Sequence, residues 1–250
     1  MKGKTFGIAL LLGTALGVTG PMVGTGHAAM APQQFVVRIE NVSTENTLKP
    51  SNGAKAPAAV APGLWIIHRD GEPLFTPGTP DRGKGLESLA EEGNPSALAM
   101  SLREQAGASG SGVFNTPVGA SGPGPIGPGG VFEFTVSASP ASRLSFAMMF
   151  GQSNDLFYAP DAKGIALFDA NGRPRSGDIT SSVILWDAGT EVNEEPGVGP
   201  NQAPRQPAPH TGLREHGVVR PISEVRDGFH YPSVSEVLRV TITPQQQMAR

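Results

Sequence analysis

The sequence contains no cysteine among its 250 residues. This absence excludes thiol nucleophiles, disulfide bonds and zinc sites built on cysteine thiolates. Tryptophan and tyrosine are scarce, with two of each, and charged residues make up only 16% of the chain. Without a covalent cross-link, the fold has to be stabilised by its hydrophobic core or by a bound ion.

Long uninterrupted helices are also lacking, because the chain carries 33 glycines and 24 prolines. Few stretches of about ten residues escape these helix breakers, which argues against helical bundles and doubly wound α/β folds. The length of 250 residues allows one large all-β domain or two small ones. Short candidate strands recur between turn residues, a pattern that is typical of an antiparallel β-sandwich.

The candidate strands are recognised by alternating hydrophobic residues or by β-branched and aromatic residues. They are Gln34–Val42, Leu64–His68, Val131–Val136, Arg143–Phe150, Gly164–Phe168, Ser182–Trp186 and Glu236–Thr243. The two strands on either side of Pro140 are predicted to form a hairpin. One region, residues 85–105, predicts two short helices, with Gly93 ending the first and Pro95 starting the second.

The stretch Gly107–Gly130 is rich in glycine, serine and proline. We interpret it as an ordered connection within a single domain of residues 32–250, because predicted strands flank it closely. A flexible linker between two domains is the alternative.

The first 31 residues are predicted to be an export signal. Lys2 and Lys4 supply positive charge, Phe6–Val18 is a short apolar run, and alanines near residues 28–31 offer cleavage sites. The apolar run is too short to span a bilayer comfortably, which favours cleavage over a retained N-terminal anchor. The mature protein is expected to be secreted or periplasmic, with no transmembrane segment.

Without Lys2 and Lys4, the mature chain has 17 basic and 22 acidic residues. This balance disfavours nucleic acid as a partner and is compatible with cation binding. The sequence contains no G-x-S-x-G, H-E-x-x-H or G-x-x-x-x-G-K-[ST] motif. We therefore predict that the protein is not an enzyme. A Ser/His/Asp triad assembled in three dimensions stays open, as does a metal group of His210, Glu215 and His216.

Carboxylates cluster where predicted strands end, in the segments Ser153–Asp155, Trp186–Glu191 and Asn193–Glu195. Calcium takes about six to eight oxygen ligands, and loops at one end of a β-sandwich can supply them from distant residues. Asp187 and Glu191 lie four residues apart across a turn that contains glycine, so both can point at one ion. The alternative is an acidic loop that is only a solvated surface.

Three segments of the second half carry a family resemblance. They are RLSFAMMFGQSNDLFY (residues 143–158), VILWDAGTEVNEEPGVGPNQAP (183–204) and DGFHYPSVSEVLRVTI (227–242). The chain resembles the spondin N-terminal domain, in the cysteine-free form found in exported bacterial proteins. The similarity extends from Phe35 to Ile242, which is nearly all of the mature chain, and the W-D-A-G-T-[DE] segment is its most specific part.

The resemblance implies a C2-like antiparallel β-sandwich with calcium held by loop carboxylates at one end, and a role in extracellular adhesion or matrix binding. By position, Asp155 matches the family's acidic residue after the Met-Met strand, and Asp187 matches the first aspartate of D-A-G-T-D. Glu191 falls where animal members have a second aspartate, and Glu91 matches an acidic position without an assigned role. Animal members contain disulfides and adjoin thrombospondin-type repeats, so their receptors do not carry over.

We therefore expect an exported, calcium-binding, non-catalytic spondin-like module with Asp155, Asp187 and Glu191 as metal ligands. Backbone carbonyls near Gly189 or Asn154 are further candidates. Its partner is expected to be an extracellular or envelope macromolecule, namely a glycan, a protein or an anionic lipid. The alternative is an exported hydrolase or redox protein that binds copper or zinc. Its candidate ligands are His68, His210, His216, Met148 and Met149, although the adjacent methionines also fit core packing.

Overall fold

The computed structural model describes residues 1, 3, 32–106 and 110–246. Residues 31–250 form one compact unit. The predicted export signal, residues 1–31, lies outside the described residues except for Met1 and Gly3. In the described part of the chain, no helix has the length and apolar character needed to cross a membrane.

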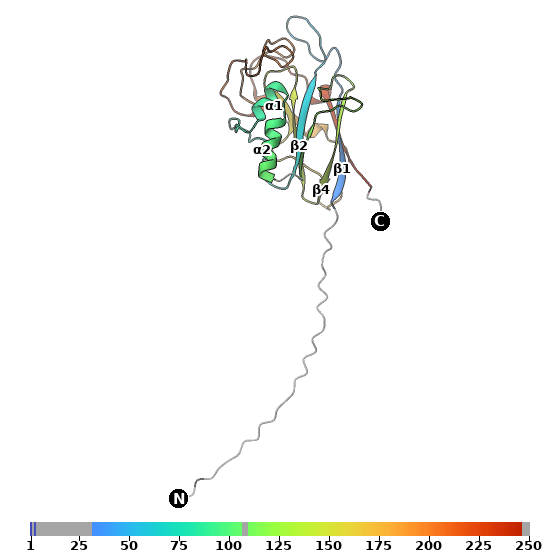
Figure 1. Ribbon diagram of the computed structural model, residues 1–250, viewed down its shortest axis with the longest axis vertical. Helices are drawn as coiled ribbons and strands as arrows, with labels where there is room; N and C mark the ends of the chain where they lie inside the picture. The colour runs from blue at the N-terminus through green and yellow to red at the C-terminus, as the bar shows by residue number, and fades with distance from the viewer. Residues whose placement is uncertain (2, 4–31, 107–109, 247–250) are drawn as a thin grey trace. The chain divides into compact units, whose positions relative to one another are not determined.

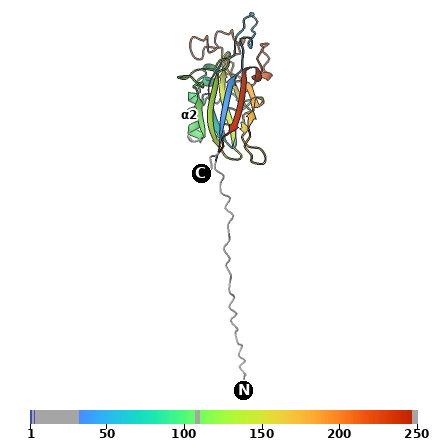
Figure 2. The ribbon, with the colours of Figure 1, turned by 90° about the vertical axis from the view of Figure 1, so that its right-hand side faces the viewer.

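The first sheet has four strands in the order β4-β1-β11-β8. Its strands are β1 (Gln33–Asn41), β4 (Val131–Ala138), β8 (Gly177–Asp178) and β11 (Leu238–Pro244). Alternate residues of β1 point into the core, so Phe35, Val37 and Ile39 are each 0% exposed. Figure 2 shows β1 and β11 side by side, in the antiparallel register that their hydrogen bonds define.

The second sheet has seven strands, six of them in the order β10-β9-β6-β5-β2-β3, with β7 pairing to β5. Its strands are β2 (Val60–His68), β3 (Ser111–Phe114), β5 (Arg143–Phe150), β6 (Leu156–Pro160), β7 (Ile165–Ala166), β9 (Val183–Asp187) and β10 (Arg220–Pro221). Every pairing between these strands is antiparallel. The prediction of an all-β antiparallel sandwich is therefore confirmed.

Three layers build the domain (Figure 1): the four-stranded sheet, the larger sheet, and the helices α1 (Leu86–Glu92) and α2 (Ser96–Ala106). One core lies between the two sheets and includes Phe132 and Phe146. A second core lies between the larger sheet and the helices and includes Leu89. Because both faces of β5 are covered, its residues 144–150 are all buried. A third helix, α3 (Val234–Val237), and two 3-10 turns, Thr180–Ser182 and Ile222–Glu224, complete the described elements.

The predicted hairpin of β4 and β5 is wrong, since the two strands belong to different sheets. Strand β4 pairs with β1, whereas β5 pairs with β2, β6 and β7. The physical reason is burial. Strand β4 carries exposed residues such as Glu133, but β5 is apolar on both faces and needs the middle of a covered sheet. The short connection therefore crosses between sheets, with Ala141 in a left-handed conformation at φ 70°.

The other predicted strands overlap observed ones, and both short helices are present. The predicted strand Glu236–Thr243 is wrong at its start, because Glu236 and Val237 belong to helix α3 and the strand begins at Leu238.

Four strands were not predicted, and two of them, β8 and β10, are only two residues long. Strand β3 lies inside the glycine-rich stretch Gly107–Gly130, which supports its interpretation as an ordered connection, although residues 107–109 are not described. Strand β6 begins directly after Asp155.

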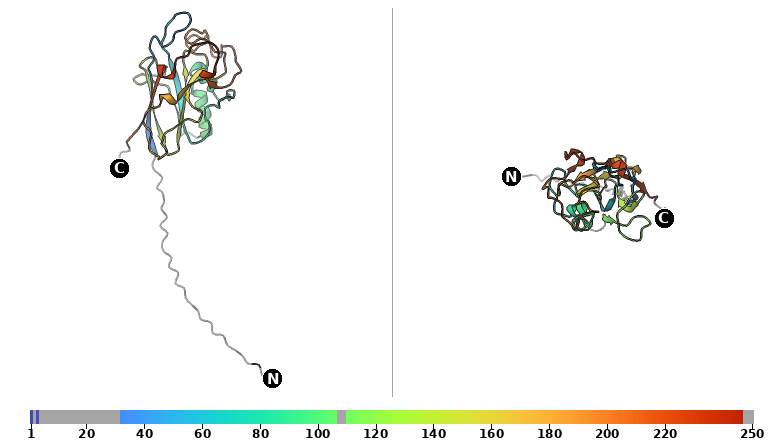
Figure 3. Two further views of the ribbon diagram at one scale, coloured as in Figure 1. Left: turned by 180° about the vertical axis from the view of Figure 1, so that it is seen from behind. Right: turned by 90° about the horizontal axis from the view of Figure 1, so that it is seen from above.

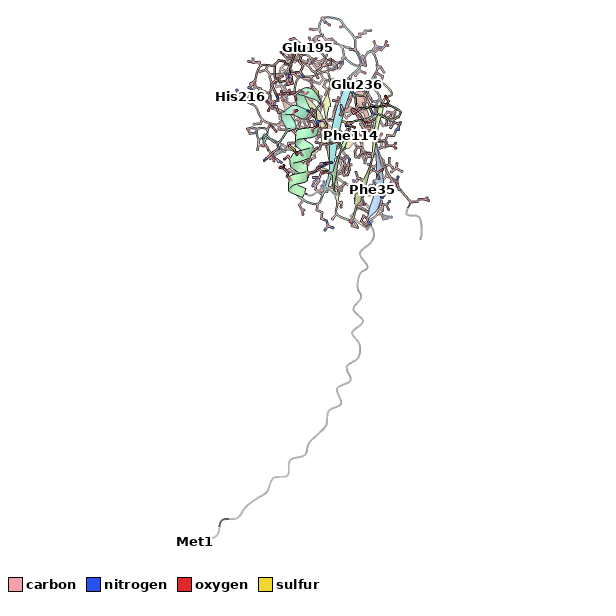
Figure 4. All side chains as sticks on the ribbon, in the orientation of Figure 1. Met1, Phe35, Phe114, Glu195, His216 and Glu236 are labelled. Carbon is pink, nitrogen blue, oxygen red and sulfur yellow. The ribbon has the colours of Figure 1, made fainter. Side chains whose placement is uncertain are left out.

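The long loops gather at one end of the sandwich. Figure 4 places Glu195 and His216 at this end and Phe35, at the start of β1, at the opposite end. Seen from behind in Figure 3, the loops that follow β9 lie beside the helical layer. The acidic segments singled out in the sequence belong to this loop end.

Candidate metal centre

Asp155 is placed by a tight turn between β5 and β6. The Ser153 hydroxyl donates to the Phe150 carbonyl at 2.6 Å and accepts from the Leu156 amide at 3.1 Å. Leu156 then pairs with Asp187 in the register of β6 and β9. The turn therefore brings the carboxylates that follow β5 and end β9 to the same edge of the sheet.

The Asp155 side chain is fully buried, at 0% exposure. Its Oδ2 accepts hydrogen bonds from the backbone amides of Thr190, at 3.0 Å, and Glu191, at 3.1 Å. Its Oδ1 has no hydrogen-bond partner. Burial, followed by the negative charge of Asp187, raises the pKa of Asp155 well above its usual value. A buried carboxylate oxygen without a partner is costly unless a proton or a cation reaches it.

Asp187 is also 0% exposed, and both of its oxygens accept hydrogen bonds. Its Oδ1 accepts from the Gly189 amide at 2.7 Å, which closes the turn after β9. Its Oδ2 accepts from Arg220 Nε at 3.0 Å and from Asn193 Nδ2 at 3.2 Å. Arg220 also contacts Glu215 Oε1, at 2.6 Å, so one guanidinium bridges two carboxylates.

Glu215 is the third carboxylate of this group. One oxygen from each of Asp155, Asp187 and Glu215 lies within 4.8 Å of the others. That spacing fits one calcium ion, because two oxygens bound at about 2.4 Å are at most about 5 Å apart. Burial, and then the charge of Asp187, raises the pKa of Glu215. Glu215 Oε2 and Asn193 Oδ1 are buried without a hydrogen-bond partner, as Asp155 Oδ1 is.

Glu191, the third predicted ligand, is not part of this carboxylate group. Its backbone amide binds Asp155, but its side chain, 3% exposed, is directed elsewhere. Glu191 Oε1 accepts from the Gly212 amide at 2.8 Å, and Oε2 accepts from Asn154 Nδ2 at 3.3 Å. The structure thus brings Asp155 and Asp187 together and places Glu215, rather than the Glu191 carboxylate, beside them.

A second group joins helix α1 to the loop that contains His210. His210 Nδ1 lies 2.8 Å from Glu91 Oε2 and 3.7 Å from Glu87 Oε1, while Nε2 lies 3.5 Å from Glu92 Oε1. Glu87, Glu91 and His210 offer ligand atoms within 4.8 Å of one another. Burial raises the pKa of Glu91 to about 7, with the Glu191 charge adding to the shift and hydrogen bonding to Thr190 and His210 opposing it.

No protein-family model and no curated protein sequence matches this chain. The resemblance to the spondin N-terminal domain therefore stays a prediction that depends on the sequence segments given above.

The remaining candidate ligands are dispersed. The structure does not bring His210, Glu215 and His216 together, because His210 and Glu215 lie in the two separate groups and His216 belongs to neither. His68 Nε2 is 2.9 Å from the Ser145 hydroxyl, near the start of β5. Met148 and Met149 are both 0% exposed within β5, and Met148 belongs to the core between the sheets. The methionine pair is thus explained by packing.

Sequence reasoning missed Glu215 and Asn193 as partners of the two aspartates. Asn193 was part of the acidic segment, but its amide carries no charge and gave no signal. Glu215 lies 28 residues after Asp187 in the sequence, in a loop whose path a strand pattern does not predict. Backbone hydrogen bonds from Glu215 to Thr190, at 3.0 Å, and from Gly217 to Gly189, at 2.8 Å, fix that path.

Proposed function

We propose that this chain is an exported calcium-binding module of the spondin type, which acts by binding at the cell surface or matrix and not by catalysis. The observation that carries the proposal is the buried Asp155 Oδ1, which has no hydrogen-bond partner and lies beside Asp187 and Glu215. Asp155, Asp187 and Glu215 would hold the ion, with Asn193 Oδ1 as a fourth oxygen.

The charges of the group support a divalent cation. Three carboxylates face one guanidinium, that of Arg220, so two negative charges are uncompensated when all three carboxylates are ionised. The donor atoms are all oxygens, which is the ligand type that calcium and magnesium prefer over zinc or copper. Calcium is favoured over magnesium because the donors come from separate loops, and calcium tolerates irregular geometry.

A binding role follows from the position of the centre. The carboxylates lie at the loop end of the sandwich, where loops from distant parts of the chain meet, and loops on a rigid scaffold commonly carry binding sites. A bound ion would fix these loops without a disulfide. The partner class stays a glycan, a protein or an anionic lipid of the envelope or the extracellular space, as the resemblance and the predicted export signal imply.

Thermal unfolding with and without calcium tests the proposal. Calcium at about 100 times its Kd stabilises the folded state by about 2.7 kcal/mol. For a domain of this size, that raises the Tm by about 5–10 °C. Asp187→Asn removes one charge from the centre with little change of shape and is expected to abolish the rise. Asp70→Asn, which removes an exposed carboxylate outside the centre, is the matched control and should keep it.

The proposal fails if chelated protein shows neither a Tm rise nor heat on titration with millimolar calcium. It fails equally if Asp187→Asn and Asp70→Asn respond to calcium alike. Magnesium and zinc titrations complete the experiment, since preference for zinc would point to the other group of side chains.

A second candidate function depends on that group. Glu87, Glu91 and His210 combine two carboxylates with an imidazole, a donor set that suits zinc. It would make the chain an exported zinc protein or a metal-dependent enzyme. Zinc binding that is lost in His210→Ala and kept in Asp187→Asn would support this candidate, and zinc binding that survives in His210→Ala would contradict it.

A further inference from the structure

A basic pocket opens beside the start of β5. It has a volume of about 650 Å³ and is lined by the cationic side chains of Arg69, Arg82, Arg143 and Lys163. Asp70 and Glu72 are the two acidic residues in its lining. Arg143 opens β5, whereas Asp155 follows the end of that strand, so the pocket is distinct from the proposed calcium centre.

The accumulation of cations runs against the charge of the whole chain. The sequence has 19 lysines and arginines against 22 acidic residues, yet four cations and two carboxylates line this pocket. None of the four cations forms an ion pair with a residue in the ranges 32–106 and 110–246. A concave surface with such an excess of one sign attracts ligands of the opposite charge.

Two of the guanidinium groups are held in place by neutral acceptors. Arg143 donates from Nε to the Lys163 carbonyl at 2.6 Å and from Nη2 to the Gly164 carbonyl at 2.7 Å. Arg82 donates from Nη1 to the Glu72 carbonyl at 2.8 Å and from Nη2 to the Thr76 hydroxyl. These bonds fix the side chains without neutralising them and leave N–H donors on each group for a ligand. Fixing donors in advance lowers the entropic cost of binding.

We propose that this pocket binds a tetrahedral oxyanion, the phosphate or sulfate group of a sugar-sized ligand. The net excess of two positive charges in the lining matches a phosphate monoester, and arginine pairs with such oxygens through parallel hydrogen bonds. The volume of about 650 Å³ exceeds what an isolated oxyanion needs and lies within the range typical of small-molecule sites. The pocket is independent of the calcium centre and would add recognition of an anionic glycan to a surface-binding module.

Isothermal titration of the purified protein tests the inference, with glucose 6-phosphate, galactose 6-sulfate, inorganic phosphate and uncharged glucose as probes. Both charged sugars are expected to bind with a Kd below about 1 mM, and glucose is expected not to bind. Stronger binding of the sugar phosphate than of inorganic phosphate would assign the remaining volume to the sugar. Equal affinities would limit the proposal to the oxyanion alone, and so overturn its sugar-sized part. Raising NaCl from about 0.05 to about 0.2 M should weaken binding, because salt screens partly exposed charges.

The variants use exposed cations, so that folding is preserved. Arg69→Gln combined with Lys163→Gln is expected to lower the affinity about tenfold, the size expected from losing two partly exposed charged contacts. Arg175→Gln removes an exposed cation outside the pocket and should leave the affinity unchanged. Absence of binding by both charged sugars, or equal affinities of the double variant and Arg175→Gln, would overturn the proposal.

The two proposals fail separately. Oxyanion binding is expected to persist in the presence of a chelator and in Asp187→Asn, and the calcium response is expected to persist in the double variant. A loss of oxyanion binding on chelation would show that the pocket depends on the calcium centre and would contradict its assignment as an independent site.

Discussion

The raised pKa of the buried Glu91 carboxyl predicts how the stability of this protein depends on pH. The side chain lies in the last turn of helix α1, is 2% exposed and lies 2.8 Å from His210 Nδ1. Its pKa rises from 4.5 to about 7 on folding, chiefly because of burial. Glu91→Gln is the informative change, because glutamine keeps an oxygen acceptor for His210 and cannot ionise.

The direction of this pH dependence follows from the direction of the pKa shift of Glu91. A carboxyl group whose folded-state pKa lies above its unfolded value stabilises the folded protein fully below the unfolded pKa, and this stabilisation is lost as the pH rises through the folded pKa. With values of 4.5 and about 7, ionisation of Glu91 costs the wild-type protein on the order of 2–3 kcal/mol of stability between pH 5 and pH 8. Glu91→Gln lacks this loss and should be the more stable protein at pH 8 by a similar amount.

His210 also makes the folded protein less stable as the pH rises. Burial lowers the pKa of His210, but the hydrogen bond to Glu91 and the charges of Glu92, Glu91 and Glu87 raise it above 6.5 overall. The stability that His210 contributes is therefore present below pH 6.5 and is lost as the pH rises through the raised pKa. Glu91→Gln removes part of this contribution too, because it deletes one of the charges that favour the imidazolium.

Urea unfolding at pH 5, 6, 7 and 8, with chelator present throughout, measures the effect. Glu104→Gln, at an exposed site on α2, is the matched control and should follow the wild-type pH profile. Parallel profiles for wild type and Glu91→Gln would refute the reasoning. A Glu91→Gln protein that is less stable than wild type at pH 8 would refute it as well, since the ionised Glu91–His210 pair would then be net stabilising.

Three further predictions concern the loop end. Asp155→Asn should raise the Tm of the chelated protein at pH 8 and abolish its calcium response, because asparagine keeps an acceptor for the amides of Thr190 and Glu191 and brings no buried charge. Glu215→Gln should weaken calcium binding in titration by about tenfold or more, and Glu191→Gln should weaken it less, because the Glu191 carboxylate lies outside the carboxylate group. Gly189→Ala should lower both the Tm and the calcium affinity, because its Cβ would lie 2.6 Å from the Val218 amide nitrogen at φ 68°. Gly172→Ala, at φ 75° with nothing within 4 Å of its Cβ, is the matched control, with only the backbone cost of about 1 kcal/mol.

A strand could be predicted from the sequence where one of its faces is buried or where both are. Strand β1 alternates because one face contacts the core, and that alternation is visible in the sequence from Phe35 onwards. The apolar run of β5 is equally visible and reflects cover on both faces. What the sequence did not reveal was pairing. The partner of β4 is β1, about 95 residues earlier, whereas local spacing favoured the adjacent β5.

Two of the three carboxylates were predictable for a related reason. Asp155 and Asp187 adjoin neighbouring strands, since Leu156 pairs with Asp187, so residues that follow or end these strands meet at one edge. Glu215 reaches the same point through a loop. The path of that loop depends on the conformation of Gly189 and on the hydrogen bonds that the Glu215 and Gly217 amides donate to the carbonyls of Thr190 and Gly189. No periodicity encodes such a path, so the third carboxylate becomes apparent only in three dimensions.

The same geometry makes protons and a cation competitors at the loop end. Asp155 and Glu215 both have raised pKa values, each with burial as the first cause and Asp187 as the next. Without an ion, a proton on one of these carboxyls relieves the repulsion that Arg220 leaves uncompensated. A bound divalent cation would relieve it instead, and its binding would release the proton. Ionisation of these buried carboxyls therefore lowers the stability of the chelated protein as the pH rises. The same ionisation would strengthen calcium binding over that pH range.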